Sequence, residues 1–214
     1  MTSLTAAALW LNTACAGFDT AVTVAIHKLY EMGGGFFTPF FEFISLLGKG
    51  GVALILLSLC LIAYKPTRRF GTAMALGLAI GALLTNLWLK VWVARPRPYS
   101  QEGSIFHELW LTVGQNMESD KSFPSGHTTA AFGAMVPVFL VGDKKKSWTA
   151  LIFAVLMGIA RIYLVVHYPT DVVGGILVGT AAGVVGALAA PRLPDRWYEL
   201  DFYKQQKGKH ECSQ

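Results

Sequence analysis

The sequence predicts an all-α integral membrane protein, a bundle of five to six transmembrane helices. Two observations favour this fold class. Hydrophobic residues make up 53% of the 214-residue chain and charged residues only 14%, a balance unlike that of water-soluble domains. In addition, residues 70–89 and 172–190 contain no charge, and each stretch is about the ~20 residues that a helix needs to cross the hydrocarbon core of a bilayer.

Residues 1–31 are predicted to form either an amphipathic helix at the membrane interface or a first membrane helix. Apolar side chains such as Trp10 and Phe18 alternate there with polar ones such as Asp19 and Lys28. The segment has no basic region before its short apolar run, so it does not resemble a cleavable signal peptide. A glycine run at residues 33–35 ends the pattern.

The next apolar stretch, residues 36–64, is interrupted by glycines around Lys49, and we expect its membrane span to cover about residues 50–64 and the preceding turn. Further spans are predicted at 70–89, 126–142, 147–166 and 172–190. Residues 90–124 are polar and contain four acids, which indicates a loop. Residues 32–190 therefore form the predicted membrane domain, and the charged residues 191–214 form a cytoplasmic tail.

Glycines recur at four-residue spacing on two of these predicted spans. They are Gly77 and Gly81 on one span and Gly175, Gly179 and Gly183 on the other. Small residues at this spacing let helix backbones approach closely in lipid, so we interpret these glycines as packing positions.

Basic residues predict the orientation of the chain in the membrane. They lie between or after the apolar segments, at Lys65, Arg68, Arg69, Lys144, Lys145, Lys146, Arg192 and Arg196. The positive-inside rule places them in the cytoplasm, which leaves residues 90–125 and 167–171 together on the extracytoplasmic side. The net charge of +5 comes from these separate groups and forms no long basic stripe, so we expect no nucleic-acid partner.

Polar residues from four chain segments fall at this same extracytoplasmic face. They are Lys90, Arg97, Ser125, His127, Arg161, His167 and Asp171. Each has an ordinary explanation when taken alone, because a lysine can extend to the headgroups and a histidine can be satisfied by its neighbours. Three cations and two imidazoles together need a shared reason. A phosphate supplies one, because its oxygens bind guanidinium and ammonium groups through charge-assisted hydrogen bonds.

Lys90, Arg97 and Arg161 are the expected phosphate cradle. Backbone N–H groups near Gly126, at the start of a predicted span, could also bind an anion, and Ser125 would add a hydroxyl donor. Pro-Ser-Gly before a helix is equally an ordinary entry turn. The imidazole of His127 favours the functional interpretation, because it could protonate a departing oxygen.

His167 and Asp171 form the second predicted pair. The carboxylate could accept the Nδ1–H of the imidazole and leave Nε2 as a nucleophile. Pro169 interrupts any continuous helix there, so Asp171 could instead cap the following helix, and both roles can coexist. Two histidines and a carboxylate also resemble a metal-ligand set. Three nearby cations would repel a divalent ion, so we expect no metal and no cofactor, although vanadate would fit.

These residues resemble the three-part signature of the type 2 phosphatidic acid phosphatase superfamily, which also includes glucose-6-phosphatase and the vanadium haloperoxidases. The first part is Lys90, six residues and Arg97-Pro98, and the second is Pro124 to His127. In the third part, Arg161 is followed at the family spacing by His167 and Asp171, but Ala160 stands where the family has serine. Loss of that hydroxyl is expected to loosen the support of Arg161 without abolishing activity. Arg95 lacks the family spacing from Lys90, and we interpret it as a supporting or headgroup contact.

The resemblance implies that His167 attacks phosphorus, Asp171 orients it, and His127 protonates the leaving group and then activates water. Lys90, Arg97, Ser125, Gly126 and Arg161 would hold the phosphoryl oxygens. It further implies a metal-independent lipid phosphatase of a bacterial inner membrane, with the active site facing the periplasm or exterior. Among family substrates we favour undecaprenyl diphosphate, with phosphatidic acid and phosphatidylglycerophosphate as alternatives. A non-catalytic lipid-phosphate transporter and a vanadium haloperoxidase are less favoured, and the sequence indicates no oligomeric state.

Overall fold

The computed structural model of this protein describes residues 4–199, and that part of the chain contains helices and no strand. The first half consists of α1 (Ala6–Ala14), α2 (Ala16–Gly33), α3 (Thr38–Gly48), α4 (Val52–Ala63), α5 (Arg68–Ala82) and α6 (Lys90–Val93). The second half consists of α7 (Ile105–Thr112), α8 (Gly126–Val141), α9 (Lys144–Ser147), α10 (Thr149–Tyr163), α11 (Pro169–Ala189) and α12 (Asp195–Glu199). The predicted all-α fold class is confirmed.

Short irregular helices join several of these elements. A 3-10 turn, Lys49–Gly51, links α3 to α4, and a π-helix, Leu83–Leu89, links α5 to α6. Further 3-10 turns lie at Lys65–Thr67, Pro98–Ser100 and Ala190–Arg192.

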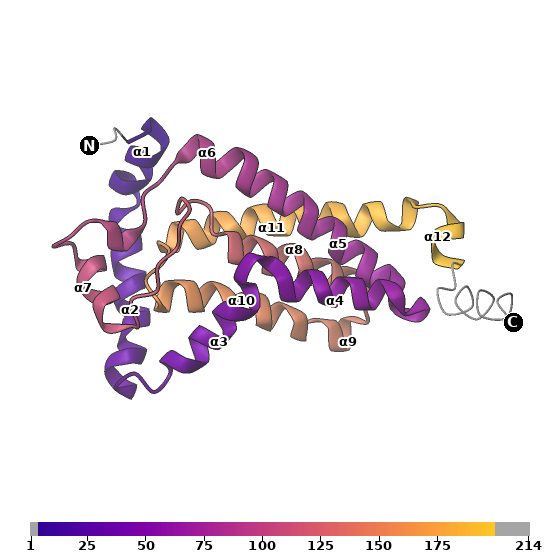
Figure 1. Cartoon of the computed structure of the whole chain (residues 1–214), viewed down its shortest axis with the longest axis horizontal. Coiled ribbons are helices and arrows are strands. Elements are labelled where there is room, and N and C mark those ends of the chain that lie inside the picture. The colour runs from indigo at the N-terminus through magenta and orange to yellow at the C-terminus, as the bar shows by residue number, and fades with distance from the viewer. Residues whose placement is uncertain (1–3, 200–214) are drawn as a thin grey trace, which may run out of the picture.

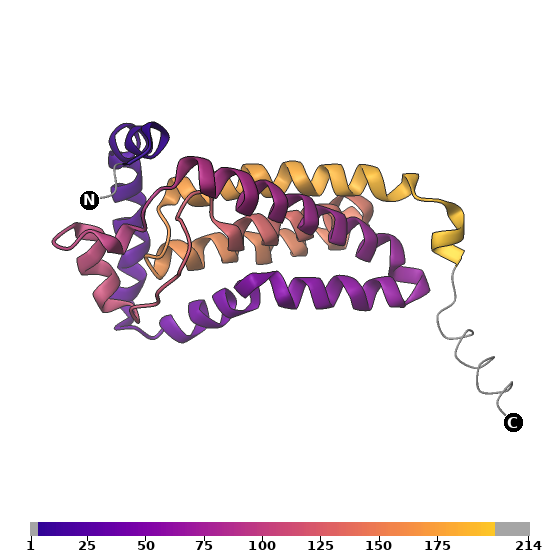
Figure 2. The ribbon, with the colours of Figure 1, turned by 45° about the horizontal axis from the view of Figure 1, so that its top comes forward.

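Five helices, α4, α5, α8, α10 and α11, run side by side along the long axis of the molecule (Figure 1). A view turned by 45° shows α2 across one end of this bundle, with the C-terminal part of the described chain at the other (Figure 2). Helix α8 packs against α5, α10 and α11 and is buried along most of its length. The core is therefore built around α8.

Glycines allow the helices around α8 to come very close. A Cβ added to Gly77 of α5 would lie 2.1 Å from the carbonyl oxygen of Gly133 of α8, and one added to Gly175 of α11 would lie 2.8 Å from the carbonyl oxygen of Ser125. Any side chain at these positions would push the backbones apart. The predicted packing role of the spaced glycines is confirmed.

Four segments of the described chain are long and apolar enough to cross a membrane. They are Thr38–Ala63, Lys65–Ser100, Lys144–Tyr163 and Pro169–Arg192. Helices α1 and α2 are bent by 61° relative to each other and could form a fifth, as one broken span. Helix α8 is apolar but has only 16 residues. The bundle therefore has the helices of a multi-pass membrane protein, while the predicted number of five to six spans stays a prediction.

Two predicted boundaries were wrong. The span predicted from about residue 50 begins at Thr38, because the glycine-containing turn at 49–51 joins two apolar helices instead of ending one. Residues 90–124 are not a continuous loop: Lys90 is helical, and α7 forms where Ser104 caps its N-terminus and Trp110 is buried. The predicted division at residues 31 and 191 stays a prediction, and residues 200–214 of the predicted tail lie outside the described chain.

Candidate active site

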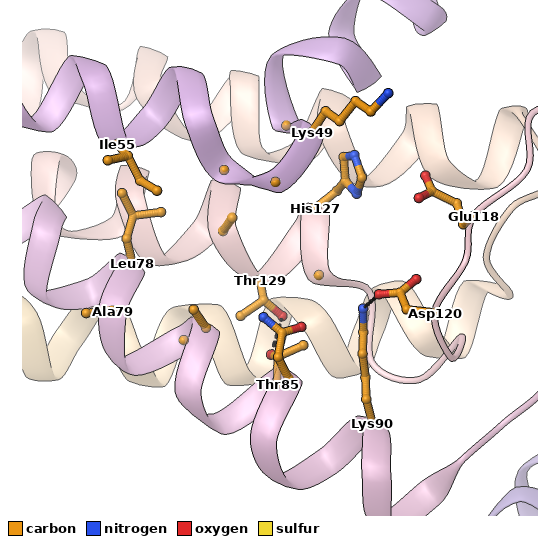
Figure 3. A pocket seen from close by; sticks show the side chains of 18 of the residues that line it. Lys49, Ile55, Leu78, Ala79, Thr85, Lys90, Glu118, Asp120, His127 and Thr129 are labelled. Carbon is orange, nitrogen blue, oxygen red and sulfur yellow. Dashed lines mark hydrogen bonds and ion pairs between the residues drawn. The ribbon is translucent and has the colours of Figure 1, made fainter.

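A cavity of about 520 Å³ lies at the end of α8 where that helix begins. Five of the eight predicted site residues line it, namely Lys90, Arg97, Gly126, His127 and His167. Figure 3 shows Lys90 and His127 projecting into the open space from different helices, with Glu118 and Asp120 facing them from the polar loop. The remaining predicted residues, Ser125, Arg161 and Asp171, are buried and do not line the cavity.

The π-helix Leu83–Leu89 directly precedes Lys90. A π-helix changes the rotation of the residues that follow it relative to a continuous α-helix, and such segments recur at functional sites. Thr85 within it donates a hydrogen bond to Thr129 Oγ1 of α8 at 3.2 Å, which ties this segment to the central helix. Gly126 gives room on the facing side, because a Cβ there would lie 3.3 Å from Lys90 Nζ.

Asp120 holds the two cations of the first motif together. Its carboxylate forms ion pairs with Lys90 and with Arg97, and its backbone carbonyl accepts a bond from Arg97 Nε at 3.0 Å. Burial alone would raise the pKa of Asp120, but hydrogen bonds and the charges of Lys90 and Arg97 outweigh it and lower the pKa to about 2. Asp120 is therefore ionised at neutral pH and lies where an anion is expected.

Arg161 lies in the last turn of α10, and one of its nitrogen donors is unused. Its Nη2 pairs with Glu118 and its Nη1 donates to Ser45 Oγ of α3. Its Nε is buried without a hydrogen-bond partner, which is uncommon for a group of this kind. A phosphate oxygen would satisfy it. Ser45 thus supplies a hydroxyl to this guanidinium, and the expectation that Ala160 loosens its support stays a prediction.

His167 lies in the turn between α10 and α11 and is 1% exposed. Its Nε2 is 2.9 Å from Arg97 Nη1. Because arginine only donates hydrogen bonds, Nε2 must be the acceptor, and the proton of the neutral ring then sits on Nδ1. Burial, together with the charges of Arg97 and Arg161, holds the pKa of His167 well below its usual range. The ring is therefore neutral at pH 7, and the electron pair of Nε2, which would attack phosphorus, accepts the bond from Arg97.

Asp171 is the third residue of α11 and contacts both that helix and His167. Its Oδ2 accepts a hydrogen bond from the backbone N–H of Tyr168 at 2.9 Å and another from the hydroxyl of Ser122. The same Oδ2 lies 3.5 Å from His167 Nδ1, but Nδ1 has no hydrogen bond. Asp171 thus helps to cap α11, but as its third residue and not as the N-cap residue, which is Tyr168. The orienting role stays a prediction that this proximity supports.

Ser125 caps α8 instead of facing the cavity. It is fully buried, and its hydroxyl oxygen accepts a bond from Thr128 Oγ1 at 3.0 Å. The entry-turn interpretation of Pro124-Ser125-Gly126 is therefore confirmed. A direct contact of Ser125 with phosphate stays a prediction.

Four charged residues near the site were not predicted as part of it: Glu118, Asp120, Arg95 and Asp19. Arg95 is 1% exposed and donates to Asp171 Oδ1 at 2.7 Å and to Asp19 Oδ2 at 2.8 Å. The interpretation of Arg95 as a headgroup contact was wrong, because its guanidinium is enclosed by protein, whereas the supporting role is confirmed. An acid within a mostly apolar helix, as Asp19 is, was the signal that could have found this group.

In the described part of the chain, no group of three His, Cys, Asp or Glu side chains is arranged to hold a metal ion. The expectation that the site works without a metal stays a prediction. What the residues do form is a histidine-containing cavity rich in cations, and this donor set suits an oxyanion.

A bundle of apolar helices with such a cavity at one end defines a helical membrane protein with an oxyanion-binding site. The sequence model of the PAP2 superfamily matches residues 69–194, which is more than half of the chain. The chain belongs to this superfamily of type 2 phosphatidic acid phosphatases, and the resemblance predicted from its three motifs is confirmed.

Several curated relatives carry phosphatase names. The chain is 32% identical over 135 residues to undecaprenyl-diphosphatase BcrC of Bacillus subtilis, covering 61% of this chain and 63% of the relative. It is 30% identical over 138 residues to an undecaprenyl-diphosphatase of Sulfolobus acidocaldarius, covering 64% and 63%. It is 38% identical over 107 residues to phosphatidylglycerophosphatase B of Bacillus subtilis, covering 45% and 46%. The chain thus spans less than two thirds of the length of these relatives.

Two solved structures share the fold. A transmembrane PAP2-type phosphatidylglycerolphosphate phosphatase from Bacillus subtilis has a TM-score of 0.66 and 26% identity, covering 88% of this chain and 92% of its own. LpxE of Aquifex aeolicus has a TM-score of 0.52 and 25% identity, covering 70% and 84%. The first of these comparisons supports a multi-pass membrane protein.

Proposed function

We propose that this chain is a membrane phosphatase that removes phosphate from a lipid phosphate or diphosphate through a phosphohistidine intermediate. The single observation that carries the proposal is the state of His167. Its ring is buried and neutral, its Nε2 accepts a bond from Arg97, and it lines the same cavity as Lys90 and Arg97. An unprotonated ring nitrogen among cations that attract phosphate is what nucleophilic attack on phosphorus requires.

Binding would exchange carboxylates for phosphate oxygens. Lys90, Arg97 and Arg161 are paired with Asp120 and Glu118 in the substrate-free protein. A phosphate offers more acceptor oxygens and more charge than either carboxylate, and one of those oxygens would satisfy the unused Nε of Arg161. The cations then face the oxygens on which negative charge is spread in the transition state.

In the first chemical step, the Nε2 electron pair of His167 forms a bond to phosphorus while the bond to the leaving oxygen breaks. The leaving oxygen takes the electron pair of the broken P–O bond and a proton from the imidazolium form of His127. Asp171 stabilises the positive charge on the ring of His167 through Nδ1–H. In the second step, His127 takes a proton from water, and the water oxygen attacks phosphorus. The N–P bond breaks and its electron pair returns to Nε2. One water is consumed, phosphate is released and both histidines are restored.

The cavity supports a substrate with an apolar tail. From the cations it extends along α4 and α5, where Ile55, Leu59 and Leu78 line it. Figure 3 shows Ile55 and Leu78 at the end of the cavity away from Lys90 and Asp120. A lipid could keep its phosphate among the cations and its chain between these two helices.

Undecaprenyl diphosphate, converted to undecaprenyl phosphate, is the favoured substrate within this class, and the alternatives are phosphatidic acid and phosphatidylglycerophosphate. The names of two relatives support this choice. Lys49 adds structural support: it lines the same cavity as His127, and within residues 4–199 it forms no ion pair. For a diphosphate, the group that leaves is itself a phosphate, and a further cation beside the general acid would stabilise its charge.

The proposed location is a bacterial inner membrane, with the cavity facing the periplasm or exterior. The basic residues Arg68 and Lys144 start α5 and α9, and α9 lies at the end of the bundle away from α2 and α7 (Figure 1). The cavity lies toward the other end of α5, where the second half of that helix and the following π-helix line it. With the basic end in the cytoplasm, the cavity opens on the outer side.

Phosphate release by purified protein tests this proposal. The panel contains undecaprenyl diphosphate, phosphatidic acid, phosphatidylglycerophosphate and glucose 6-phosphate, each with and without chelator, and the control is His167→Ala. We expect release from lipids in chelator, loss of release in the control, and an acid-labile phosphoprotein in quenched wild-type reactions.

Other outcomes would replace the proposal. Lipid binding without turnover in the wild type would indicate a transporter, and bromide oxidation with added vanadate would indicate a haloperoxidase. Turnover that stops in chelator would contradict the metal-independent mechanism, and turnover of glucose 6-phosphate alone would contradict the lipid substrate.

A further inference from the structure

Arg95 is enclosed behind the cavity by four polar groups from three parts of the chain. Its Nη1 donates to Asp171 Oδ1 and to Thr170 Oγ1, each at 2.7 Å. Its Nη2 donates to Asp19 Oδ2 and its Nε to Asn12 Oδ1, each at 2.8 Å. Four of the five N–H donors of this guanidinium are therefore used inside the protein, and its side chain is 1% exposed.

Asp19 connects the N-terminal helices to the start of α11. It lies on α2 and is 1% exposed. Its Oδ1 accepts a hydrogen bond from the backbone N–H of Thr170 at 2.8 Å, and its Oδ2 accepts one from Thr170 Oγ1 at 2.9 Å. Asp19 thus holds the residue immediately before Asp171 by both its backbone and its side chain.

One guanidinium is shared between two carboxylates in this group. The side chain of Arg95 is 1% exposed, that of Asp19 is 2% exposed and that of Asp171 is fully buried. Buried charges are stable only when they are paired and hydrogen-bonded, so each carboxylate depends on its share of Arg95. The position of Asp171 therefore depends on Asp19, although the two side chains belong to different helices.

The contact between Asp171 and His167 is sensitive to small shifts. Asp171 Oδ2 lies 3.5 Å from His167 Nδ1, which has no hydrogen bond. A movement of a few tenths of an ångström would bring the two atoms within normal hydrogen-bond distance, and a movement the other way would separate them. The groups that hold Asp171 Oδ1, chiefly Arg95, therefore determine whether Asp171 can orient His167.

We propose that Asp19, acting through Arg95 and Thr170, is a positioning residue that sets the distance between Asp171 and His167. Helix α2 then belongs to the catalytic apparatus, not only to the membrane anchor. The inference rests on the proposed phosphatase reaction, because it assigns Asp19 an effect on the nucleophile of that reaction. Asp19 contacts neither the phosphate cradle nor the apolar end of the cavity.

The test compares Asp19→Asn with the wild type in the full-length protein. Asparagine keeps the size and one acceptor for the Thr170 N–H but removes the charge, so Arg95 pairs with Asp171 alone and shifts it. We expect kcat, and the rate of phosphoenzyme formation in quenched single-turnover reactions, to fall tenfold or more per folded active site. KM should stay within about twofold, because the cradle is unchanged.

Thr23→Val is the matched control. Thr23 lies one turn after Asp19 on the buried face of α2, and its hydroxyl has no hydrogen-bond partner, so the substitution should leave kcat and KM unchanged. Thr170→Val provides a second variant should Asp19→Asn not fold, because it removes the hydroxyl that bridges Arg95 and Asp19. It should lower kcat in the same pattern, and Thr170→Ser, which keeps the hydroxyl, should lose less.

A merely structural role would reduce the amount of folded protein without changing the rate per active site. Unchanged kcat in folded Asp19→Asn, or a loss confined to KM, would therefore overturn the inference. A different result would contradict the proposed function, namely a wild-type protein that releases no phosphate from any lipid phosphate.

Discussion

Substitution of Asp120 by asparagine should strengthen phosphate binding, because it removes an anion that competes for the same cations. Lys90 and Arg97 lower the pKa of Asp120 from 3.8 to about 2, and each pKa unit corresponds to about 1.4 kcal/mol. The net effect, after the opposing contribution of burial, is then about 2.5 kcal/mol. Because the Asp120 side chain is 47% exposed, solvent screening reduces the usable part to about 1 kcal/mol, or a roughly fivefold change in affinity.

The inhibition constant of inorganic phosphate measures this effect more directly than KM, which also depends on turnover. We expect the constant of Asp120→Asn to be roughly fivefold lower than that of the wild type. A carboxylate with a depressed pKa keeps its interaction above its unfolded pKa and loses it only as the pH falls through about 2. The ratio of the two constants should therefore be the same from pH 5 to pH 8.

Glu102→Gln is the control, because Glu102 is an exposed acid of the same polar stretch that does not line the cavity. It should leave the inhibition constant unchanged. Weaker phosphate binding in Asp120→Asn would refute the reasoning, since it would mean that the carboxylate holds the cations in their binding positions instead of competing with phosphate.

Three further predictions follow from the same geometry. The ring of His167 should stay neutral down to pH 5.5, because burial and two arginines lower its pKa; a ¹⁵N-histidine NMR signal that titrates near pH 6.5 and is absent in His167→Gln would contradict this. Lys49→Met should lower kcat/KM for a lipid diphosphate about tenfold and for the matching monophosphate less than threefold. Lys28→Met, at an exposed position of α2, is the control. Equal losses for the two substrates would show that Lys49 does not recognise the diphosphate. Gly77→Ala should destabilise the fold by about 1–3 kcal/mol, because its Cβ would lie 2.1 Å from a carbonyl oxygen of α8. Gly17→Ala, where a Cβ meets nothing within 4 Å, should not lower the melting temperature, and similar shifts in the two variants would contradict the packing argument.

The sequence predicted the convergence of the cationic and histidine residues, because charged groups at the ends of apolar segments are informative by position. Lys90, Arg97, His127 and His167 all line one cavity. The positive-inside rule and the motif spacing both depend on which residues occur at which positions, and no side-chain contact is needed to apply them.

The pairing of those cations could not be predicted in the same way. Asp120 and Glu118 occur in a polar stretch where carboxylates are ordinary, and no periodicity links them to Lys90 or Arg161. The π-helix before Lys90 was missed for a related reason: an apolar run has the same composition whether its backbone is α or π. Hydropathy alone placed the edge of the span at residue 89, although the helix continues to Val93.

The carboxylates of Glu118 and Asp120 also affect how strongly the site binds the abundant lipids of a membrane. Glu118 and Asp120 neutralise two of the three positive charges of Lys90, Arg97 and Arg161. Bulk phosphodiester lipids carry a single negative charge, so they gain little by displacing a carboxylate, whereas a terminal phosphate carries nearly two charges and gains more. Abundant phosphodiester lipids would then compete weakly for the site, so that a scarce lipid phosphomonoester or diphosphate could still bind it.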